Sequence, residues 1–151
     1  MSRIDELIAR YCPDVVSRQE LGEIGSITRG KRFVKADMRN EGSPCIHYGE
    51  IYTKYGTSAK TAFSFLDRAQ AARLRSARSG DVIVASAGET IDDIGKAVAW
   101  LGSENVVIHD ACYAFRSPLD PKYVAYFFQT ADLRNQIRRN ISSSKISSIS
   151  T

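Results

Sequence analysis

The feature that most constrains this chain is a series of short apolar segments between Leu21 and Arg116, separated by Gly, Ser and Asn. Segments of about four to eight residues bounded by turn residues are typical of β-strands rather than helices. The predicted strands are residues 21–28, 45–51, 61–66, 82–86, 98–101, 106–109 and 112–116. With 151 residues, the chain has room for one sizeable core and about one domain.

Helices are predicted on both sides of this strand region. Ser2 is suited to cap a helix whose apolar residues recur at helical spacing. Asp120 is suited to cap a C-terminal helical region, either one helix or two helices broken near Thr130, and residues 67–78 form a brief helical or irregular link. The serine-rich end, 141–151, shows no cap or closing element. The predicted fold class is α+β: a twisted, mixed or antiparallel sheet with long polar loops, a short N-terminal helix and C-terminal helices.

Positive charge is concentrated in two stretches of the chain, from Arg29 to Arg78 and after Asp132, where four bases and no acid follow. The net charge is +4, and between Arg29 and Arg78 eleven Lys or Arg residues stand against four acids. A basic stretch of this kind is typical of a nucleic-acid contact surface, and a solvated basic surface is the alternative. No apolar run approaches the roughly 18 residues that span a bilayer, and three widely spaced cysteines suit free thiols in a reducing compartment. We therefore expect a cytoplasmic protein without a membrane partner.

The segment "GSITRGKR", Gly25 to Arg32, comes within one residue of the phosphate-binding loop of nucleotide hydrolases. The last position of that loop supplies a hydroxyl for magnesium, and Arg32 supplies none. The loop also requires a helix after it, whereas a basic, irregular segment follows here. A nucleotide-dependent enzyme therefore stays an alternative, and the favoured interpretation is a basic turn. Its side chains suited to phosphates are Arg29, Lys31, Arg32 and Lys35.

Both histidines of the chain lie near cysteines, as Cys45-x-His47 and His109-x-x-Cys112. Two Cys and two His are a legitimate tetrahedral zinc set, so a zinc-dependent enzyme is a second form of the enzyme alternative. Neither spacing is that of the usual zinc knuckle, and cysteines on strands are commonly packed as small apolar residues. No oxyanion loop or orienting group accompanies them as a nucleophilic pair.

Two further segments place polar side chains after a strand. In "GSPCIHYGEIYTKYG" a strand from Cys45 to Tyr48 meets a Gly-Glu turn, and a loop from Tyr52 to Thr57 follows. After the strand that begins at Val82, the segment from Ser86 to Thr90 opens a second polar loop. Lys, Tyr, Thr and Ser contact phosphates and base edges, so we interpret both loops as facing DNA.

The order of these segments resembles a type I restriction-modification DNA specificity subunit, over essentially the whole chain. The resemblance is carried by "MSRIDELIARYCPD", "LGEIGSITRGK", "SPCIHYGEIYTKYG", "SGDVIVASAGET", "IGKAVAW" and "DPKYVAYFFQTADLRNQIRRNISSSKISSIST". It implies a target recognition domain that reads one half of a split DNA sequence. It also implies partners, namely the modification (methyltransferase) and restriction subunits. Catalytic residues and cofactors belong to those subunits, so the resemblance implies neither for this chain.

We therefore expect residues 1–151 to form a single target recognition domain, without the spacer helix that follows such a domain in the family. The predicted function is sequence-specific recognition of double-stranded DNA. A protein-interaction module for a methyltransferase subunit is a further alternative. The residues predicted to contact DNA are Arg29, Lys31, Arg32, Lys35, Tyr52, Thr53, Lys54, Tyr55, Thr57, Ser86 and Thr90.

Overall fold

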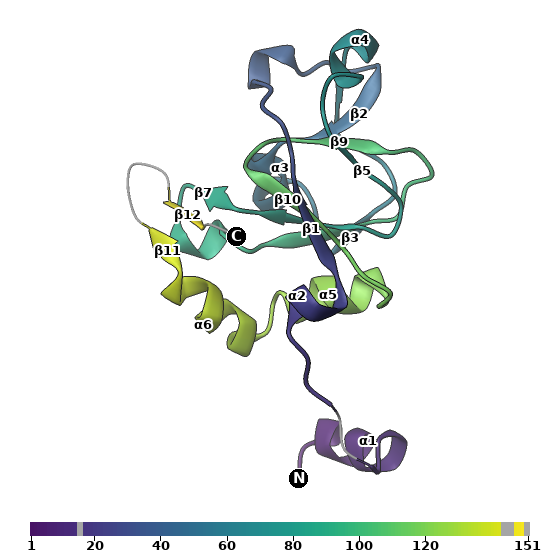
Figure 1. Cartoon of the computed structure of the whole chain (residues 1–151), viewed down its shortest axis with the longest axis vertical. Coiled ribbons are helices and arrows are strands. Elements are labelled where there is room, and N and C mark those ends of the chain that lie inside the picture. The colour runs from purple at the N-terminus through teal and green to yellow at the C-terminus, as the bar shows by residue number, and fades with distance from the viewer. Residues whose placement is uncertain (15–16, 143–146, 150–151) are drawn as a thin grey trace.

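The computed structural model describes residues 1–14, 17–142 and 147–149, and Figure 1 shows three small sheets with helices at both ends of the chain. The largest sheet has the order β1-β10-β6-β8-β3. Its strands are β1 (Ser26–Arg29), β10 (Cys112–Arg116), β6 (Val82–Ala85), β8 (Ala97–Trp100) and β3 (Ser58–Ala59). All neighbours in it are antiparallel except β3 and β8, which are parallel.

The second sheet has the order β4-β2-β9-β5, with β2 and β9 parallel and the outer pairs antiparallel. Its strands are β4 (Ser64–Leu66), β2 (Ser43–Ile46), β9 (Val106–Ile108) and β5 (Ser76–Ala77). The mixed sheets and the flanking helices confirm the predicted fold class. The predicted strands 82–86, 98–101, 106–109 and 112–116 correspond to β6, β8, β9 and β10, and the 61–66 prediction overlaps β4.

A third, small sheet joins the serine-rich end to the middle of the chain. Strand β7 (Ala87–Gly88) pairs with β12 (Ser147–Ile149), which in turn pairs with β11 (Ile141–Ser142). The expectation of an end without any closing element was therefore wrong for these residues, since main-chain pairing to β7 takes that role. Residues 143–146 and 150–151 lie outside the described part of the chain.

The helices begin largely where their caps were expected. Ser2 caps α1 (Arg3–Tyr11), and the Asp120 carboxylate accepts from the amides of Lys122 and Tyr123 at the start of α5 (Pro121–Phe127). Thr130 ends this helical region and caps α6 (Ala131–Arg139), which confirms the break. The link that begins at Asp67 contains the short helix α4 (Arg68–Ala71). Two 3-10 helices, η1 (Lys35–Asp37) and η2 (Ile91–Asp93), complete the irregular segments.

Two predicted strands are partly helical in the structure. The first, 21–28, begins as the helix α2 (Leu21–Ile24) and becomes strand only from Ser26. The second, 45–51, ends at Ile46, and α3 (Tyr48–Thr53) follows directly. Short apolar runs do not distinguish a strand from one turn of buried helix, and local capping decides the outcome.

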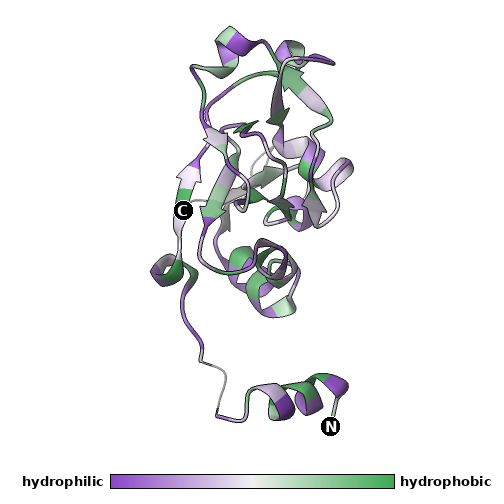
Figure 2. Cartoon of the chain, turned by 90° about the vertical axis from the view of Figure 1, so that its right-hand side faces the viewer, coloured by the Kyte–Doolittle hydropathy of each residue, from purple (hydrophilic) through white to green (hydrophobic). Residues whose placement is uncertain are grey.

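The core lies on both faces of the large sheet. One face packs against α5 and α6, which lie beneath the sheet in Figure 1, and the other packs against α3 and the second sheet. The first face buries Val82, Val84, Ala97, Ala99, Phe115, Val124, Ala125, Phe128 and Leu133. The second buries Ile46, Ile51, Ile83, Ala85, Val98, Trp100, Ile108, Cys112 and Ala114, among others. Helix α1 lies apart from these layers in both views and buries none of its residues (Figures 1 and 2).

Candidate nucleic-acid interface

The second sheet ends in two histidines that stand side by side. The parallel register pairs Ile46 with Ile108, so His47 and His109 follow at the carboxyl ends of β2 and β9. Their ring centroids are 4.4 Å apart. Each Nδ1 accepts a hydrogen bond from the main-chain amide two residues on, Gly49 at 3.2 Å and Ala111 at 3.0 Å. Both strands therefore end with the same side-chain-to-main-chain hydrogen bond.

Their surroundings keep both histidines neutral. Burial, followed by repulsion from His109 and Lys35, lowers the pKa of His47 to about 4, although Asp110 opposes this shift. Burial also lowers the pKa of His109, against the attraction of Asp110. An Asp110 carboxylate oxygen lies 2.9 Å from His109 Nδ1, which the Ala111 amide also approaches. Because burial favours the neutral form of His47, its Nδ1 can carry the lone pair that accepts from the Gly49 amide.

Basic side chains surround this histidine pair. Arg29 Nε donates to the Asp110 carbonyl at 2.7 Å, and Arg75 Nη1 donates to the Arg29 carbonyl at 3.0 Å. Lys31 Nζ lies 3.5 Å from the Arg73 carbonyl. Arg32 and Lys35 lie close enough to affect the titration of His109 and His47, respectively. We call these residues the basic cluster: Arg29, Lys31, Arg32, Lys35, Arg73 and Arg75.

Gly30 explains how the basic segment reaches this position. It is buried, its amide donates to the Cys112 carbonyl at 3.0 Å, and a Cβ on it would overlap the carbonyls of Ile108 and His109. The glycine therefore allows close packing of one main chain on another. Residues 26–29 form strand β1, and a 3-10 helix follows only at Lys35, so the segment does not have the geometry of a phosphate loop.

All six residues of the basic cluster are exposed, and their charges are not neutralised by acids. Within residues 1–14, 17–142 and 147–149, none of the six forms an ion pair. The hydrogen bonds described for them go to main-chain carbonyls, which orient a side chain without cancelling its charge. The cluster therefore presents a positive potential to solvent.

Helix α3 takes the place of the predicted Gly-Glu turn and of the first two residues, Tyr52 and Thr53, of the predicted loop. His47 is its N-cap, and the Glu50 carboxylate accepts from the His47 amide at 2.9 Å and from the Ser64 hydroxyl. Glu50 is only 5% exposed, so it is a buried capping residue and not the exposed turn that was expected. The capping box and the buried Ile51 favour the helix over a loop.

The C-terminal end of α3 forms one wall of a groove of about 590 Å³. Tyr52, Tyr55 and Thr57 line this wall, while Gln129, Arg134 and Arg138 line the opposite side, with Asp92 and Lys96 between them. Tyr55 Oη accepts from the Phe63 amide at 3.1 Å. Burial raises the pKa of both Tyr52 and Tyr55 to about 12, so both hydroxyls keep their protons at neutral pH. We call this site the tyrosine groove.

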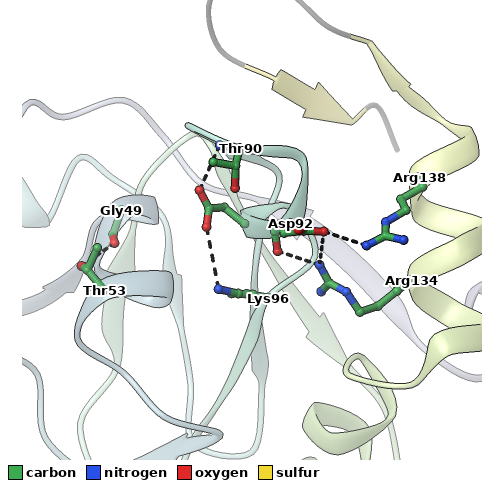
Figure 3. A network of polar contacts seen from close by, with 8 residues as sticks. Gly49, Thr53, Thr90, Asp92, Lys96, Arg134 and Arg138 are labelled. Carbon is green, nitrogen blue, oxygen red and sulfur yellow. Dashed lines mark hydrogen bonds and ion pairs between the residues drawn. The ribbon is translucent and has the colours of Figure 1, made fainter.

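Ion pairs connect the far wall of the tyrosine groove to η2 (Figure 3). Arg138 Nη2 donates to Asp92 Oδ1 at 2.7 Å, and Arg134 Nη2 donates to the Asp92 carbonyl at 2.6 Å. Asp93 accepts from the Thr90 amide at 3.0 Å and pairs with Lys96 at 3.7 Å. The cations of the groove are thus matched with acids, unlike those of the basic cluster.

Comparisons with known proteins bear on this fold. No family model matches the chain, and no curated protein matches its sequence. Among solved structures, the type I restriction-modification S subunit from M. genitalium is 13% identical, with a TM-score of 0.54 over 87% of this chain. The HsdS subunit from Thermoanaerobacter tengcongensis is 16% identical, with a TM-score of 0.56 over 97%. The chain has the fold of a type I S subunit.

A chain from a structure of the type I R-M system, solved for its assembly and conformational transition, is 18% identical with a TM-score of 0.52 over 83% of this chain. The match covers 30% of the M. genitalium subunit, 32% of this second chain and 38% of the Thermoanaerobacter subunit. The chain thus spans about a third of the length of the structures that it resembles. None of the helices within the described ranges combines the length and apolarity needed to cross a membrane.

On this S-subunit fold, the predicted residues fall into two groups and a remainder. Arg29, Lys31, Arg32 and Lys35 belong to the basic cluster, and Tyr52, Tyr55 and Thr57 belong to the tyrosine groove. The remainder lies outside both groups: Thr53, Lys54, Ser86 and Thr90. Thr53 donates to the Gly49 carbonyl at 2.6 Å, and Lys54 lies 3.8 Å from the Glu50 carboxylate.

The polar loop expected from Ser86 to Thr90 contains the two-residue strand β7 and is buried over its first three residues. Ser86 is only 6% exposed, and its amide donates to the Ala111 carbonyl at 2.9 Å. Ala87 and Gly88 form β7, and exposure begins at Glu89. Ser86 is therefore buried and not on an exposed loop, whereas Thr90 is exposed at the start of η2, and the contact of either residue with DNA stays a prediction.

The four residues of the zinc alternative do not form a metal site. Cys45 and Cys112 are fully buried and belong to different core clusters. Burial raises the pKa of Cys45 to about 12 and also raises that of Cys112, which disfavours the thiolates that bind zinc. In the part of the chain that the structure describes, no three His, Cys, Asp or Glu side chains are grouped as metal ligands.

Sequence reasoning missed several members of both groups, although it did expect Arg134 and Arg138 to serve either DNA or a helix–helix interface. Arg73 and Arg75 join the basic cluster from the segment between α4 and β5, and only the sheet topology shows this. The histidine pair had a visible signal, because "CIHYG" and "VIHDA" share an Ile-His step at the end of an apolar run. Arg134 and Arg138 lie four residues apart, which places them on one face of a helix.

Proposed function

We propose that this chain is a target recognition domain for double-stranded DNA in a type I restriction-modification system. In this role it reads one half of a bipartite site and directs methyltransferase and endonuclease subunits to it. The chain itself contributes recognition and no catalysis, and it acts in the cytoplasm. The S-subunit fold supports this proposal, and residues 1–151 are proposed to be one such domain.

The observation that carries the proposal is the unpaired charge of the basic cluster. The six cations are exposed and have no acidic partner within the described residues, and three of them, Arg29, Lys31 and Arg75, are oriented by hydrogen bonds to main-chain carbonyls. Each phosphate that such a cation neutralises releases condensed counterions from the duplex, which favours binding entropically. The positive charge therefore supplies affinity without regard to sequence.

The tyrosine groove is the part proposed to supply selectivity. Tyr52 and Tyr55 offer protonated hydroxyls and aromatic faces, and Thr57 and Gln129 add uncharged polar groups. Uncharged donors and acceptors of these types read base edges in the major groove. Tyr48 connects the two regions, because its ring lies 4.5 Å from that of His47 and 6.3 Å from that of Tyr52.

The salt dependence of DNA binding tests the proposal. The purified chain is titrated with a random-sequence duplex and with duplexes selected from that pool, between about 50 and 200 mM salt. We expect the Arg32→Gln/Lys35→Gln variant to lower the log-log salt slope by about 1.8, since each lost phosphate contact removes about 0.9. Lys60→Gln/Lys122→Gln removes equal charge from exposed positions outside the cluster and serves as the control.

Three results would count against the proposal. Binding that does not change with salt would exclude a phosphate-driven interface. Copurification with a methyltransferase subunit without any shift of DNA would favour the protein-interaction alternative. Equal losses from the cluster variant and its control would show that net charge, and not the cluster, carries the binding.

A further inference from the structure

Part of the positive charge that lines the tyrosine groove is neutralised by an acidic side chain of the same groove. Its lining includes Lys96, Arg134 and Arg138, but Asp92 holds both arginines (Figure 3). Arg138 Nη2 donates to Asp92 Oδ1 at 2.7 Å, while Arg134 Nη2 donates to the Asp92 carbonyl at 2.6 Å and lies 4.0 Å from the same carboxylate oxygen. Within the described ranges, neither arginine pairs with any other acid. One carboxylate therefore controls the charge of one wall of the groove.

Asp92 has no structural duty that would require this carboxylate. The neighbouring Asp93 accepts from the Thr90 amide at the start of η2, so the local turn is capped without Asp92. The Asp92 side chain is 71% exposed, and exposed ion pairs of this kind contribute little to stability. Because the pair is weak and reachable, another anion can replace the carboxylate at low cost.

A phosphodiester is the anion whose chemistry matches. Guanidinium groups bind carboxylates and phosphates through the same fork of N–H donors. We propose that Asp92 is a specificity-determining residue that competes with DNA phosphates for Arg134 and Arg138. This inference rests on the proposed function and extends it. Unrelated DNA, held only by the basic cluster, leaves the arginines with Asp92, whereas a matched site that also engages the groove displaces the carboxylate.

The test is the affinity of Asp92→Asn for a random-sequence duplex, measured by fluorescence anisotropy between about 50 and 200 mM salt. The amide keeps the shape of the side chain and removes its charge. We expect roughly three- to tenfold tighter binding near 0.1 M salt, and a log-log slope steeper by about 1 to 2 as one or both arginines become available to phosphates. Glu104→Gln removes the same charge from an exposed position outside the groove and is the matched control.

A second background shows whether the arginines carry the effect. In the Arg134→Gln/Arg138→Gln protein, Asp92→Asn is expected to change the affinity less than twofold. A gain that persists there, or that Glu104→Gln reproduces, would assign the effect to net charge and overturn the inference. Unchanged binding by Asp92→Asn, with wild-type binding that still depends on salt and on Arg32 and Lys35, would overturn this inference alone. Wild-type protein that binds no duplex would overturn the proposed function and this inference together.

Discussion

The basic cluster and the tyrosine groove both contain lysines and arginines, but the groups that these side chains contact differ between the two regions. Arg29 and Arg75 of the cluster donate to main-chain carbonyls and have no acid beside them, whereas in the groove Arg138 donates to the Asp92 carboxylate, and Arg134, which donates to the Asp92 carbonyl, also lies 4.0 Å from that carboxylate. A carbonyl orients a cation and leaves its full charge available, and a carboxylate cancels that charge. Local density of Lys and Arg is therefore a poor guide to where a protein attracts an anion. Whether a cation attracts an anion depends on the group that the cation already contacts.

The first prediction separates the two regions by their effect on DNA affinity. Replacing Arg29, Lys31, Arg32 and Lys35 together with Gln should weaken duplex binding roughly 10²- to 10³-fold near 0.1 M salt, with a slope lower by about 3 to 4. Arg134→Gln/Arg138→Gln removes two cations that are already paired, so its effect on random-sequence DNA should stay below about threefold. Equal losses per charge in anisotropy titrations would remove the distinction between cluster and groove.

The second prediction concerns the helix that connects the two regions. Glu50→Ala removes the carboxylate that accepts from the His47 amide and the Ser64 hydroxyl, and leaves both donors buried. The free energy of unfolding should fall by about 3 kcal/mol, measured by urea denaturation. Glu41→Ala, at an exposed position, should change it by less than about 0.5 kcal/mol. A small effect at Glu50 would mean that the groove wall is not anchored by this cap.

The third prediction uses the titration of the histidine pair beneath the basic cluster. The pKa of His47 falls from 6.5 in the unfolded chain to about 4 in the folded one, so the folded state binds fewer protons in this range. Stability is therefore intact above pH 6.5 and decreases as the pH falls toward 4, by about 2 kcal/mol after allowance for partial hydration. Thermal unfolding across this pH range measures the loss.

His47→Asn is the matched variant for this titration. Asn keeps a side-chain oxygen as an N-cap acceptor and does not titrate, so its stability should depend less on pH than that of the wild type. The same pH dependence in both proteins would assign the titration to other groups.

The fourth and smallest effect is on the ion pairs of the groove. Arg138→Gln should lower the free energy of unfolding by only about 0.5 kcal/mol, because Arg138 and Asp92 are both largely exposed. The difference between variant and wild type should vanish near 1 M salt, where the pair is screened. A loss of several kcal/mol would show that the pair is structural and not the exchangeable contact inferred above.

The sequence predicted locally specified elements better than those that depend on long-range pairing. The residues of β10 were predicted without error, the caps at Ser2 and Asp120 begin their helices as expected, and the helical region breaks near Thr130. These elements are specified locally, by apolar runs between turn residues and by capping side chains. Strand β7 could not be predicted, because two small residues become a strand only by pairing with Ser147 and Ser148.

For the candidate site, residue type was informative and residue environment was not. Tyr52, Tyr55 and Thr57 do lie together, but they lie on the end of a helix and the turn after it. The sequence pattern did not indicate this helix, because it did not show that His47 is an N-cap. Ser86 was expected on a polar loop after its strand, but it is 6% exposed and its amide donates to the Ala111 carbonyl. Charge pairing between residues as distant as Asp92 and Arg138 has no local signal at all.

The matched histidines at the ends of β2 and β9 have a consequence for how such a domain can diversify. In each case the donor is a main-chain amide, which every residue except proline supplies. Positions 48, 49, 110 and 111 can therefore exchange side chains while the strand ends stay closed, and a Cβ at Gly49 would meet only ordinary contacts. Main-chain amides thus hold the strand ends, while the side chains at the same positions form the surface. The specificity of the surface can therefore change while the fold stays the same.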